Sequence, residues 1–177
     1  KVVESMNQKA VALNADISKD GDIQQMVERS FRFSSIIDVI INCAAAPIPN
    51  IKVTELEWKD ILKQIESNIK STFEIIKEIL PAMIENKYGR IINIGSYSAD
   101  KPNNDWAHYI IAKTALEGLT KALSFELGPK GIAVNMVTPS LVSTDLTADI
   151  PRKYKLLTAS QTPLRRLADA VDVAGAI

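Results

Sequence analysis

The chain has 177 residues, 46% of them hydrophobic, which suits one domain with a substantial core. Its 21 basic and 21 acidic residues cancel, so no net field favours nucleic acid or an anionic membrane as a partner. The single Cys43 excludes an internal disulfide framework and is ordinary for a reducing cytoplasm, and one histidine makes a zinc site of the usual kind unexpected. No apolar run approaches the roughly 18 residues of a membrane span. We therefore expect a cytoplasmic protein.

Predicted strands and helices alternate along the chain. Four apolar runs are typical of strands covered on both faces, because they are nearly continuous: AVALNA (10–15), DVIINCA (38–44), RIINIGS (90–96) and IAVNMVT (132–138). Helical patterns cover residues 20–31, 54–87 with an interruption near Asn68, and 106–127. A looped tail with short helices follows, and its last helix starts near Asp169. This alternation predicts an α/β fold, a Rossmann-like doubly wound parallel sheet in three layers.

Ligands of such folds bind at the carboxyl ends of the strands. That rule directs attention to Asp16, to residues 42–45, to Ser96 and to the segment from Pro139 onward. Ser96 and the helix that begins at residue 106 start on the same rim. A hydroxyl, a phenol and an ammonium could therefore converge there.

Tyr-x-x-x-Lys occurs twice, as Tyr97 with Lys101 and as Tyr109 with Lys113. Pro102 biases Lys101 away from the α region, so the first pair is expected on a loop without fixed geometry. The second pair lies one turn apart on one face of the helix 106–127, which residues 103–105 could cap and GPKG (128–131) ends. Only the second pair is expected to act as a unit.

Together, NCAA (42–45), Ser96 thirteen residues before Tyr109, Lys113, and VTPSLVSTDL (137–146) resemble the short-chain dehydrogenase/reductase family. The likeness is greatest to its single-domain branch, which includes β-ketoacyl-acyl-carrier-protein reductases. Asn68 matches the family's fourth catalytic position. The resemblance implies an oxidoreductase that transfers a hydride between a nicotinamide cofactor, NAD or NADP, and a carbonyl/alcohol substrate, possible substrates including 3-oxoacyl thioesters.

The resemblance also implies a role for each catalytic residue. Tyr109 is the proton donor or base, and the Lys113 ammonium is expected to lower the pKa of the phenol from its usual value of about 10. Ser96 would hydrogen-bond the substrate oxygen, and Asn68 would hold a water that links Lys113 to solvent. Lys113 would also reach the cofactor ribose.

The cofactor contacts that the resemblance implies extend over three strand ends. Besides Tyr109 and Lys113 they are Asp16, Ile17, Asn42, Ala44, Pro139, Val142 and Thr144. Two of these have simpler structural readings, since Asp16 could cap the next turn and Asn42 could bond a neighbouring strand. Ala45 and Ser140 stand where the family usually has glycine, so Ser140 would be strained if its backbone angle were unusual.

The family's glycine-rich phosphate loop has no counterpart among the seven glycines of the chain. Residues 1–177 are therefore expected to form one partial NAD(P)-binding domain that lacks this loop and the C-terminal strand. If the missing segment is disordered, we expect run 10–15 to stand apart from the other three strands by a two-strand gap. A polypeptide of these residues alone is expected to bind NADH or NADPH weakly or not at all, whereas a longer parent would bind either one or both in the micromolar range.

Two competing functions remain open at this stage: a cofactor-free, truncated or non-catalytic member of the fold, and a sugar-nucleotide epimerase or dehydratase. The expected partners are a small-molecule or carrier-bound carbonyl substrate, with no nucleic acid and no membrane. Apolar residues on more than one face of segments 54–87 and 106–127 predict a homodimer or homotetramer through these helices. His108 points away from Tyr109 and is expected at the surface or an interface, and the basic PRKYK (151–155) could contact an acidic carrier protein.

Overall fold

A computed structural model describes residues 8–144, 147 and 150–177 of the chain. Its sheet is parallel and has the strand order β1 (Val39–Asn42), β2 (Gly89–Ile94), β3 (Ile132–Val137). The register pairs Val39 with Arg90 and Gly89 with Ile132. Three of the four apolar runs are thus confirmed as adjacent parallel strands.

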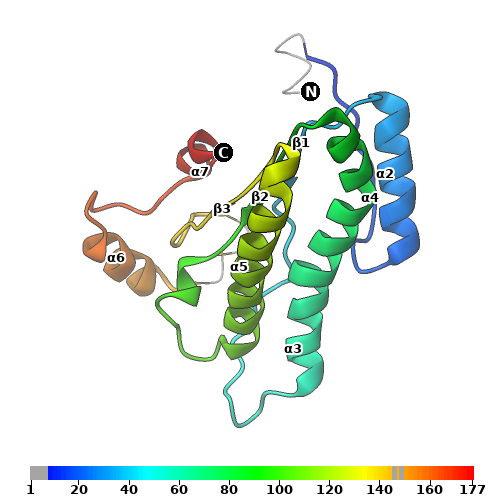
Figure 1. Ribbon diagram of the computed structural model, residues 1–177. Coiled ribbons are helices and arrows are strands. Elements are labelled where there is room, and N and C mark those ends of the chain that lie inside the picture. Colours follow the sequence, from blue (N-terminus) through cyan, green and yellow to red (C-terminus); the bar gives the residue numbers. More distant parts are fainter. Residues whose placement is uncertain (1–7, 145–146, 148–149) are drawn as a thin grey trace.

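The helices between the strands gather on one side of the sheet (Figure 1). They are α2 (Asp20–Phe33), α3 (Trp58–Ile65), α4 (Ser71–Asn86) and α5 (Ala107–Leu127). The short helices α6 (Arg152–Gln161) and α7 (Ala170–Ala176) lie beyond β3 on the other side. Three shorter turns are η1 (Glu66–Lys70), η2 (Tyr97–Ala99) and η3 (Gly128–Lys130). This order of elements is an incomplete Rossmann-like α/β fold, as the alternating pattern predicted.

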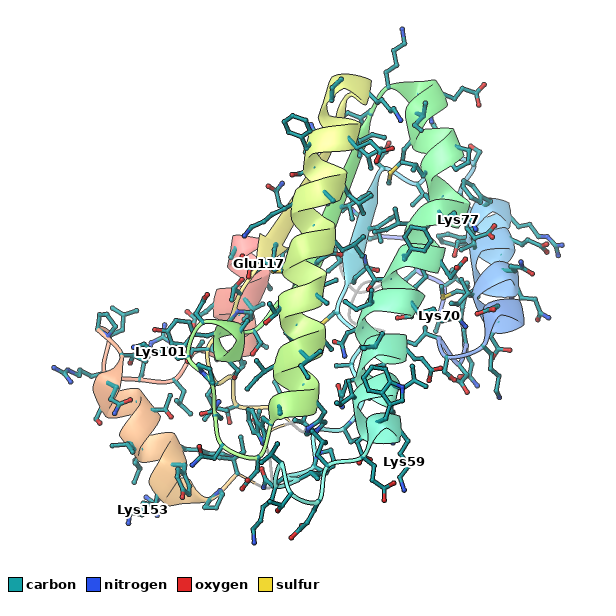
Figure 2. The ribbon with its side chains drawn as sticks, turned by 60° about the horizontal axis from the view of Figure 1, so that its bottom comes forward. Lys59, Lys70, Lys77, Lys101, Glu117 and Lys153 are labelled. Carbon is teal, nitrogen blue, oxygen red and sulfur yellow. The ribbon has the colours of Figure 1, made fainter. Side chains whose placement is uncertain are left out.

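The core fills the space between the sheet and the first helices. Aliphatic side chains of α2, α4 and the end of α5 pack on the inward residues of the strands: Ile23, Val27, Ile76, Ile79, Met83, Leu127, Ile40, Ile91, Ile132 and Val134. Burying each such side chain is worth about 1.5–3 kcal/mol, and this burial anchors the helices that carry the site. Charged side chains lie on the outer faces (Figure 2), where Lys70 bridges to Asp20 of α2 at 2.7 Å.

The predicted strand at 10–15 is wrong. Residues 8–16 form no regular element, and Val11 stays half exposed. A strand needs a neighbour for its backbone groups, and β1 instead ends the sheet on that side. Val39 and Ile41 are each 48% exposed on the face of β1 that the helices leave open.

The long predicted helix 54–87 begins later than expected and is interrupted rather than broken. Residues 66–70, which contain Asn68, form a π-helical turn between α3 and α4, so the chain continues in one direction. The predicted caps at 103–105 are also wrong, because Trp106 occupies the N-cap of α5 and no side chain caps it. The predicted last helix is confirmed, with Asp169 as its capping residue.

Within the part of the chain that the structure describes, none of the helices combines the length and the hydrophobicity that crossing a bilayer requires.

Candidate active site

Ser96 and Tyr109 meet at the carboxyl end of β2. Ser96 directly follows the Gly89–Ile94 strand and Gly95, and it caps η2, its hydroxyl accepting a hydrogen bond from the Ser98 backbone N–H at 3.2 Å. Tyr109 lies in the first turn of α5, and its side chain is buried. The Ser96 side chain is close enough to the phenol to lower its pKa, against the larger effect of burial. The structure thus brings the predicted hydroxyl and phenol together.

Lys113 lies one turn after Tyr109 on the same face of α5. Its ammonium lies 5.7 Å from the centre of the Tyr109 ring and donates a hydrogen bond to the Ile94 carbonyl at 2.7 Å. Burial lowers the pKa of Lys113 to about 8, and the nearby Cys43 opposes that shift. The ammonium is therefore mostly charged at neutral pH and is held between the phenol and the end of β2.

The net lowering of the Tyr109 pKa that the sequence predicted is not found in this structure. Burial raises the pKa of Tyr109, and the interaction with Ser96 only partly offsets that rise. Loss of water disfavours the phenolate, and the Lys113 ammonium donates its hydrogen bond to the Ile94 carbonyl. Tyr109 therefore keeps its proton at neutral pH, which is the state required of a proton donor.

Asn68 lies in the π-helical turn and is buried. Its amide N–H donates to the Gln64 carbonyl at 2.9 Å, to the Gln64 side chain at 3.2 Å and to the Ser67 hydroxyl at 3.1 Å. Its Oδ1 has no hydrogen-bond partner among the described residues. A buried acceptor without a partner is rare, and π turns are frequent at functional sites. The η1 turn packs against α5, the helix that carries Tyr109 and Lys113.

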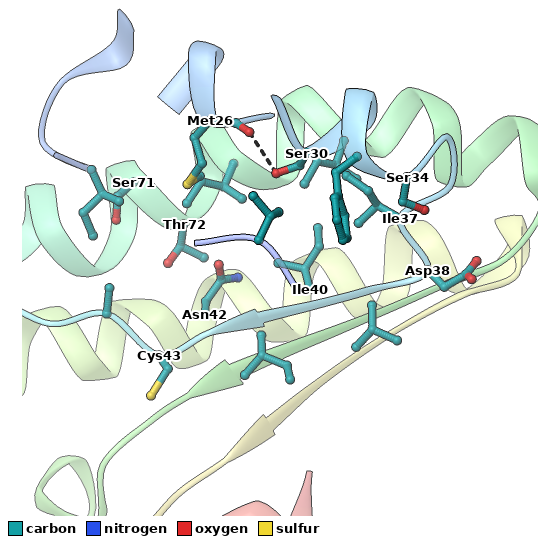
Figure 3. A pocket seen from close by; sticks show the side chains of 18 of the residues that line it. Met26, Ser30, Ser34, Ile37, Asp38, Ile40, Asn42, Cys43, Ser71 and Thr72 are labelled. Atoms are coloured by element: carbon teal, nitrogen blue, oxygen red, sulfur yellow. Dashed lines mark hydrogen bonds between the residues drawn. The ribbon is translucent and has the colours of Figure 1, made fainter. Parts of the chain in front are cut away.

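A groove of about 560 Å³ follows the open edge of the sheet (Figure 3). Three residues proposed for cofactor contact line it: Ile17, Asn42 and Ala44. The rest of its wall is largely apolar and comes from α2, β1 and α4, with Ser71 and Thr72 near its end at Asn42 and Cys43. Mostly apolar walls with a few polar groups are usual for small-molecule sites. Three of the residues that the sequence predicted for cofactor contact thus line one groove at the carboxyl end of β1.

Asn42 and Asp16 make local hydrogen bonds of the kind that their structural interpretations predicted. The Asn42 amide donates to the side chain of Asn93 at 2.8 Å, and Asn93 in turn donates to the Thr120 hydroxyl at 2.9 Å. Asp16 accepts from the Ser18 backbone and hydroxyl at 3.1 and 2.7 Å, and these hydrogen bonds lower its pKa. Both side chains have remaining acceptor capacity, so the local contacts do not preclude a cofactor.

Pro139, Val142 and Thr144 follow β3 on the same rim as Ser96. The Pro139 carbonyl accepts from the Tyr97 backbone at 2.9 Å, which ties this segment to η2. Val142 forms a parallel bridge to Ala168. Ser140 is absent from the non-glycine residues with positive φ in the described chain, so the strain considered for it does not arise. Residues 145 and 146 of the VTPSLVSTDL motif lie outside the described residues.

The other tyrosine–lysine pair has a different geometry. Tyr97 lies in η2 and Lys101 just after it, with the ammonium 5.4 Å from the centre of the Tyr97 ring. The pair is in contact, contrary to the expectation of no fixed geometry, but Tyr97 is 39% exposed, whereas Tyr109 is buried. Trp106 packs edge-on against Tyr109 and donates to Asn50, which supports its reading as a packing residue.

Comparison with known proteins agrees with this geometry. The family model described as Enoyl-(Acyl carrier protein) reductase matches residues 1–177. The 3-oxoacyl-(acyl-carrier-protein) reductase FabG of Staphylococcus epidermidis is 30% identical over 181 residues, which is 99% of this chain and 73% of the relative. The protein of the same name from Escherichia coli K12 is 32% identical over 173 residues, or 97% and 69%. That from Vibrio cholerae is 31% identical over the same shares.

The chain belongs to the short-chain dehydrogenase/reductase family. It is an NAD(P)-dependent oxidoreductase of that family, and the cofactor supplies or accepts the hydride that no side chain can provide. The groove beside Asn42 and the ammonium of Lys113 fit such a group, since they offer an apolar wall for adenosine and a cation for ribose oxygens.

Sequence reasoning missed the residues that hold the site in place. Gln64 is buried and donates from its side chain to the Pro47 carbonyl at 2.8 Å, which fixes the loop after β1. Asn93 is fully buried and links β1 to α5 through Asn42 and Thr120. The available signal was a polar residue in the middle of an apolar run, IINI, where a buried amide must find partners.

Proposed function

We propose that this reductase converts the 3-oxo group of a carrier-bound acyl thioester to a 3-hydroxy group, with NADPH or NADH as hydride donor. The observation that supports this most is the convergence of Ser96, Tyr109 and Lys113 at one rim of the sheet. The names of the relatives point to the same substrate class.

In this mechanism the carbonyl oxygen of the substrate sits between Ser96 and Tyr109. The Ser96 hydroxyl donates a hydrogen bond to that oxygen, and the Tyr109 phenol transfers its proton as negative charge develops there. The raised pKa of Tyr109 keeps the proton on the phenol until then. The site is therefore set up for reduction, and the reverse reaction would need the phenolate to be stabilised first.

Lys113 and Asn68 act after Tyr109 has given up its proton. Once Tyr109 has given up its proton, the Lys113 ammonium stabilises the phenolate 5.7 Å from the ring centre. The unpartnered Oδ1 of Asn68 is an acceptor for a water that would return a proton from solvent. Both roles use groups that the fold already holds in place.

The α6 helix offers the features that a carrier-bound acyl chain requires. In both general views it lies beside the η2 segment (Figures 1 and 2). It exposes apolar side chains, Tyr154, Leu156 and Leu157, next to the basic Arg152 and Lys153. The apolar groups suit an acyl chain, and the basic ones suit an acidic carrier surface.

Activity measurements test this proposal. The purified protein is expected to oxidise NADPH or NADH in the presence of a 3-oxoacyl thioester, with a higher kcat/KM for the carrier-bound form than for a short free thioester. Simple secondary alcohols should be poor substrates with NAD or NADP. Reduction of free ketones with no preference for thioesters would contradict the substrate assignment.

The single cysteine provides an independent test of the cofactor position. Cys43 is exposed at the carboxyl end of β1 and lines the groove. A thiol reagent should label it in the free protein, and millimolar NADPH or NADH should slow that labelling, whereas adenine alone should protect less. A cofactor-free member of the fold, the competing hypothesis, would show neither protection nor turnover.

We also propose that the reductase assembles through the outer faces of its long helices. In the described chain these faces expose Trp58 and Leu62 of α3, Phe73 of α4, and Ile111 and Phe125 of α5. An apolar second face needs a cover, and a symmetric copy provides one. Light scattering at micromolar concentration should give a dimer or a tetramer, and a clean monomer would contradict this.

A further inference from the structure

The single histidine of the chain occupies an unusual place. His108 lies in the first turn of α5, directly before Tyr109. The sequence predicted a position at the surface or an interface for it, but it is only 1% exposed within one copy of the chain. Neither ring nitrogen has a hydrogen-bond partner among the described residues.

The surroundings of His108 are a polar seam between two helices. The α3 helix and the η1 turn pack against α5. Asp60, Gln64 and Asn68 follow each other at intervals of four residues on this side of α3 and η1, and Gln64 and Asn68 are buried and bonded to each other. The Asp60 carboxylate is close enough to act on the imidazole. The seam thus runs from His108 to the turn that presents Asn68.

A positive charge on His108 is opposed from two sides. Burial removes the water that would solvate an imidazolium, and the N-terminus of α5 carries the positive end of its helix dipole. Asp60 favours the charged form, but its Oδ2 already caps α3 by accepting from the Glu57 backbone at 3.1 Å. The net result is that burial lowers the pKa of His108, with Asp60 opposing.

The other ionisable side chains on the elements packed against α5, and on its own first two turns, are few. They are Lys59, Lys63, Glu66, Lys70, Tyr97, Lys130, Tyr109 and Lys113. Lys59 and Lys70 are bound to Glu57 and Asp20. Of the two carboxylates on these elements, Asp60 and Glu66, Asp60 is the one that acts on the ring.

We propose that His108 is a neutral positioning residue that docks the first turn of α5 on α3, so that its protonation loosens the turn carrying Tyr109. The predicted effect of pH on turnover rests on the proposed function, whereas the predicted effect of pH on stability does not. His108 touches no reacting atom; it acts through the placement of Tyr109 beside Ser96.

The sign of the pH dependence follows from the two states of the chain. In the unfolded chain the imidazole has a pKa of about 6.5, and in the folded chain it is lower. The unfolded state therefore binds more protons below pH 6.5, and stability falls as the pH drops through that value. Lys113, with a pKa of about 8, stays charged throughout this range and does not contribute.

The single histidine gives one Hε1 and one Hδ2 resonance, so its titration can be followed by NMR without telling it apart from other histidines. Between pH 8 and 5 the folded protein should show no midpoint near 6.5. Thermal or urea unfolding should show the equilibrium shifting toward the unfolded state by up to about tenfold per pH unit below 6.5. His108→Phe and His108→Gln keep the bulk without a titrating group, and both should lose this acid dependence.

Turnover provides the second arm. At pH 7.5 His108→Phe should keep most of the wild-type kcat, whereas at pH 5.5 the wild type should lose more of its kcat than the variant, with KM little changed. A normal midpoint near 6.5 in the folded wild type would overturn the proposal. The proposal would also be overturned if the stability of the wild type and of both variants depended equally on pH below 6.5. If both variants fail to fold, the wild-type titration still decides, and a wild type without turnover would refute only the proposed function.

Discussion

Tyr109→Phe should lower turnover with a 3-oxoacyl thioester at least about 10²-fold, because it removes the proton donor and leaves the ring in place. The phenyl ring can still pack against Trp106 and beneath the Lys113 ammonium. The variant should fold as the wild type does, so the loss should appear in kcat, with KM little altered. Steady-state kinetics at neutral pH measure the effect.

Tyr97→Phe is the matched control. Tyr97 also precedes a lysine by four residues and also lies near Ser96 in sequence, yet its phenol is exposed and its lysine stacks over its ring. This variant should stay within a few-fold of the wild type. Equal losses of turnover in the two variants would show that Tyr109 and Lys113 are not the catalytic pair.

Gly131→Ala should destabilise the fold by about 2–4 kcal/mol, the second large effect. Gly131 ends the η3 turn before β3 with φ of 81°, a backbone conformation that costs a residue with a Cβ. A Cβ at this position would lie 2.2 Å from the Lys87 carbonyl oxygen, which is backbone and cannot rotate away. Urea unfolding should show a lower midpoint with an unchanged slope.

Gly128→Ala tests whether the loss of stability comes from the position of a Cβ at residue 131 and not from any substitution in the η3 turn. Gly128 begins the same turn with φ of −51°, and a Cβ there would meet nothing within 4 Å. Its substitution should change the free energy of unfolding by no more than about 1 kcal/mol. Similar losses at both glycines would mean that the Lys87 carbonyl contact is not what requires Gly131.

Local patterns were enough for the parts of the site that lie on single elements. The run RIINIGS led to β2 and to Ser96 at its end, and the uninterrupted segment 106–127 led to α5 with Tyr109 and Lys113 one turn apart. Both inferences need only the chain's own periodicity and stop signals. The same holds for Asp169 as the start of the last helix.

Contacts between distant residues needed the tertiary structure. Run 10–15 has the composition of a strand but no strand beside it, so its backbone pairs with none. His108 has a polar side chain on a helix, but packing in the folded chain, where α3 lies against α5, leaves it 1% exposed. The raised pKa of Tyr109 also depends on burial by neighbours that no local pattern reveals.

The sequence by itself thus determined the three strands of the sheet, the place of Ser96 at the end of β2, and the α5 helix with Tyr109 and Lys113 one turn apart, because each depends on residues within a few turns of one another. Only the tertiary structure decided that Lys113 bonds the Ile94 carbonyl, that Asn68 lies in a π turn with an unpartnered oxygen, and that His108 is buried. The physical reason is that desolvation and hydrogen-bond partnership are set by whatever packs against a side chain, and those neighbours lie far away in the sequence.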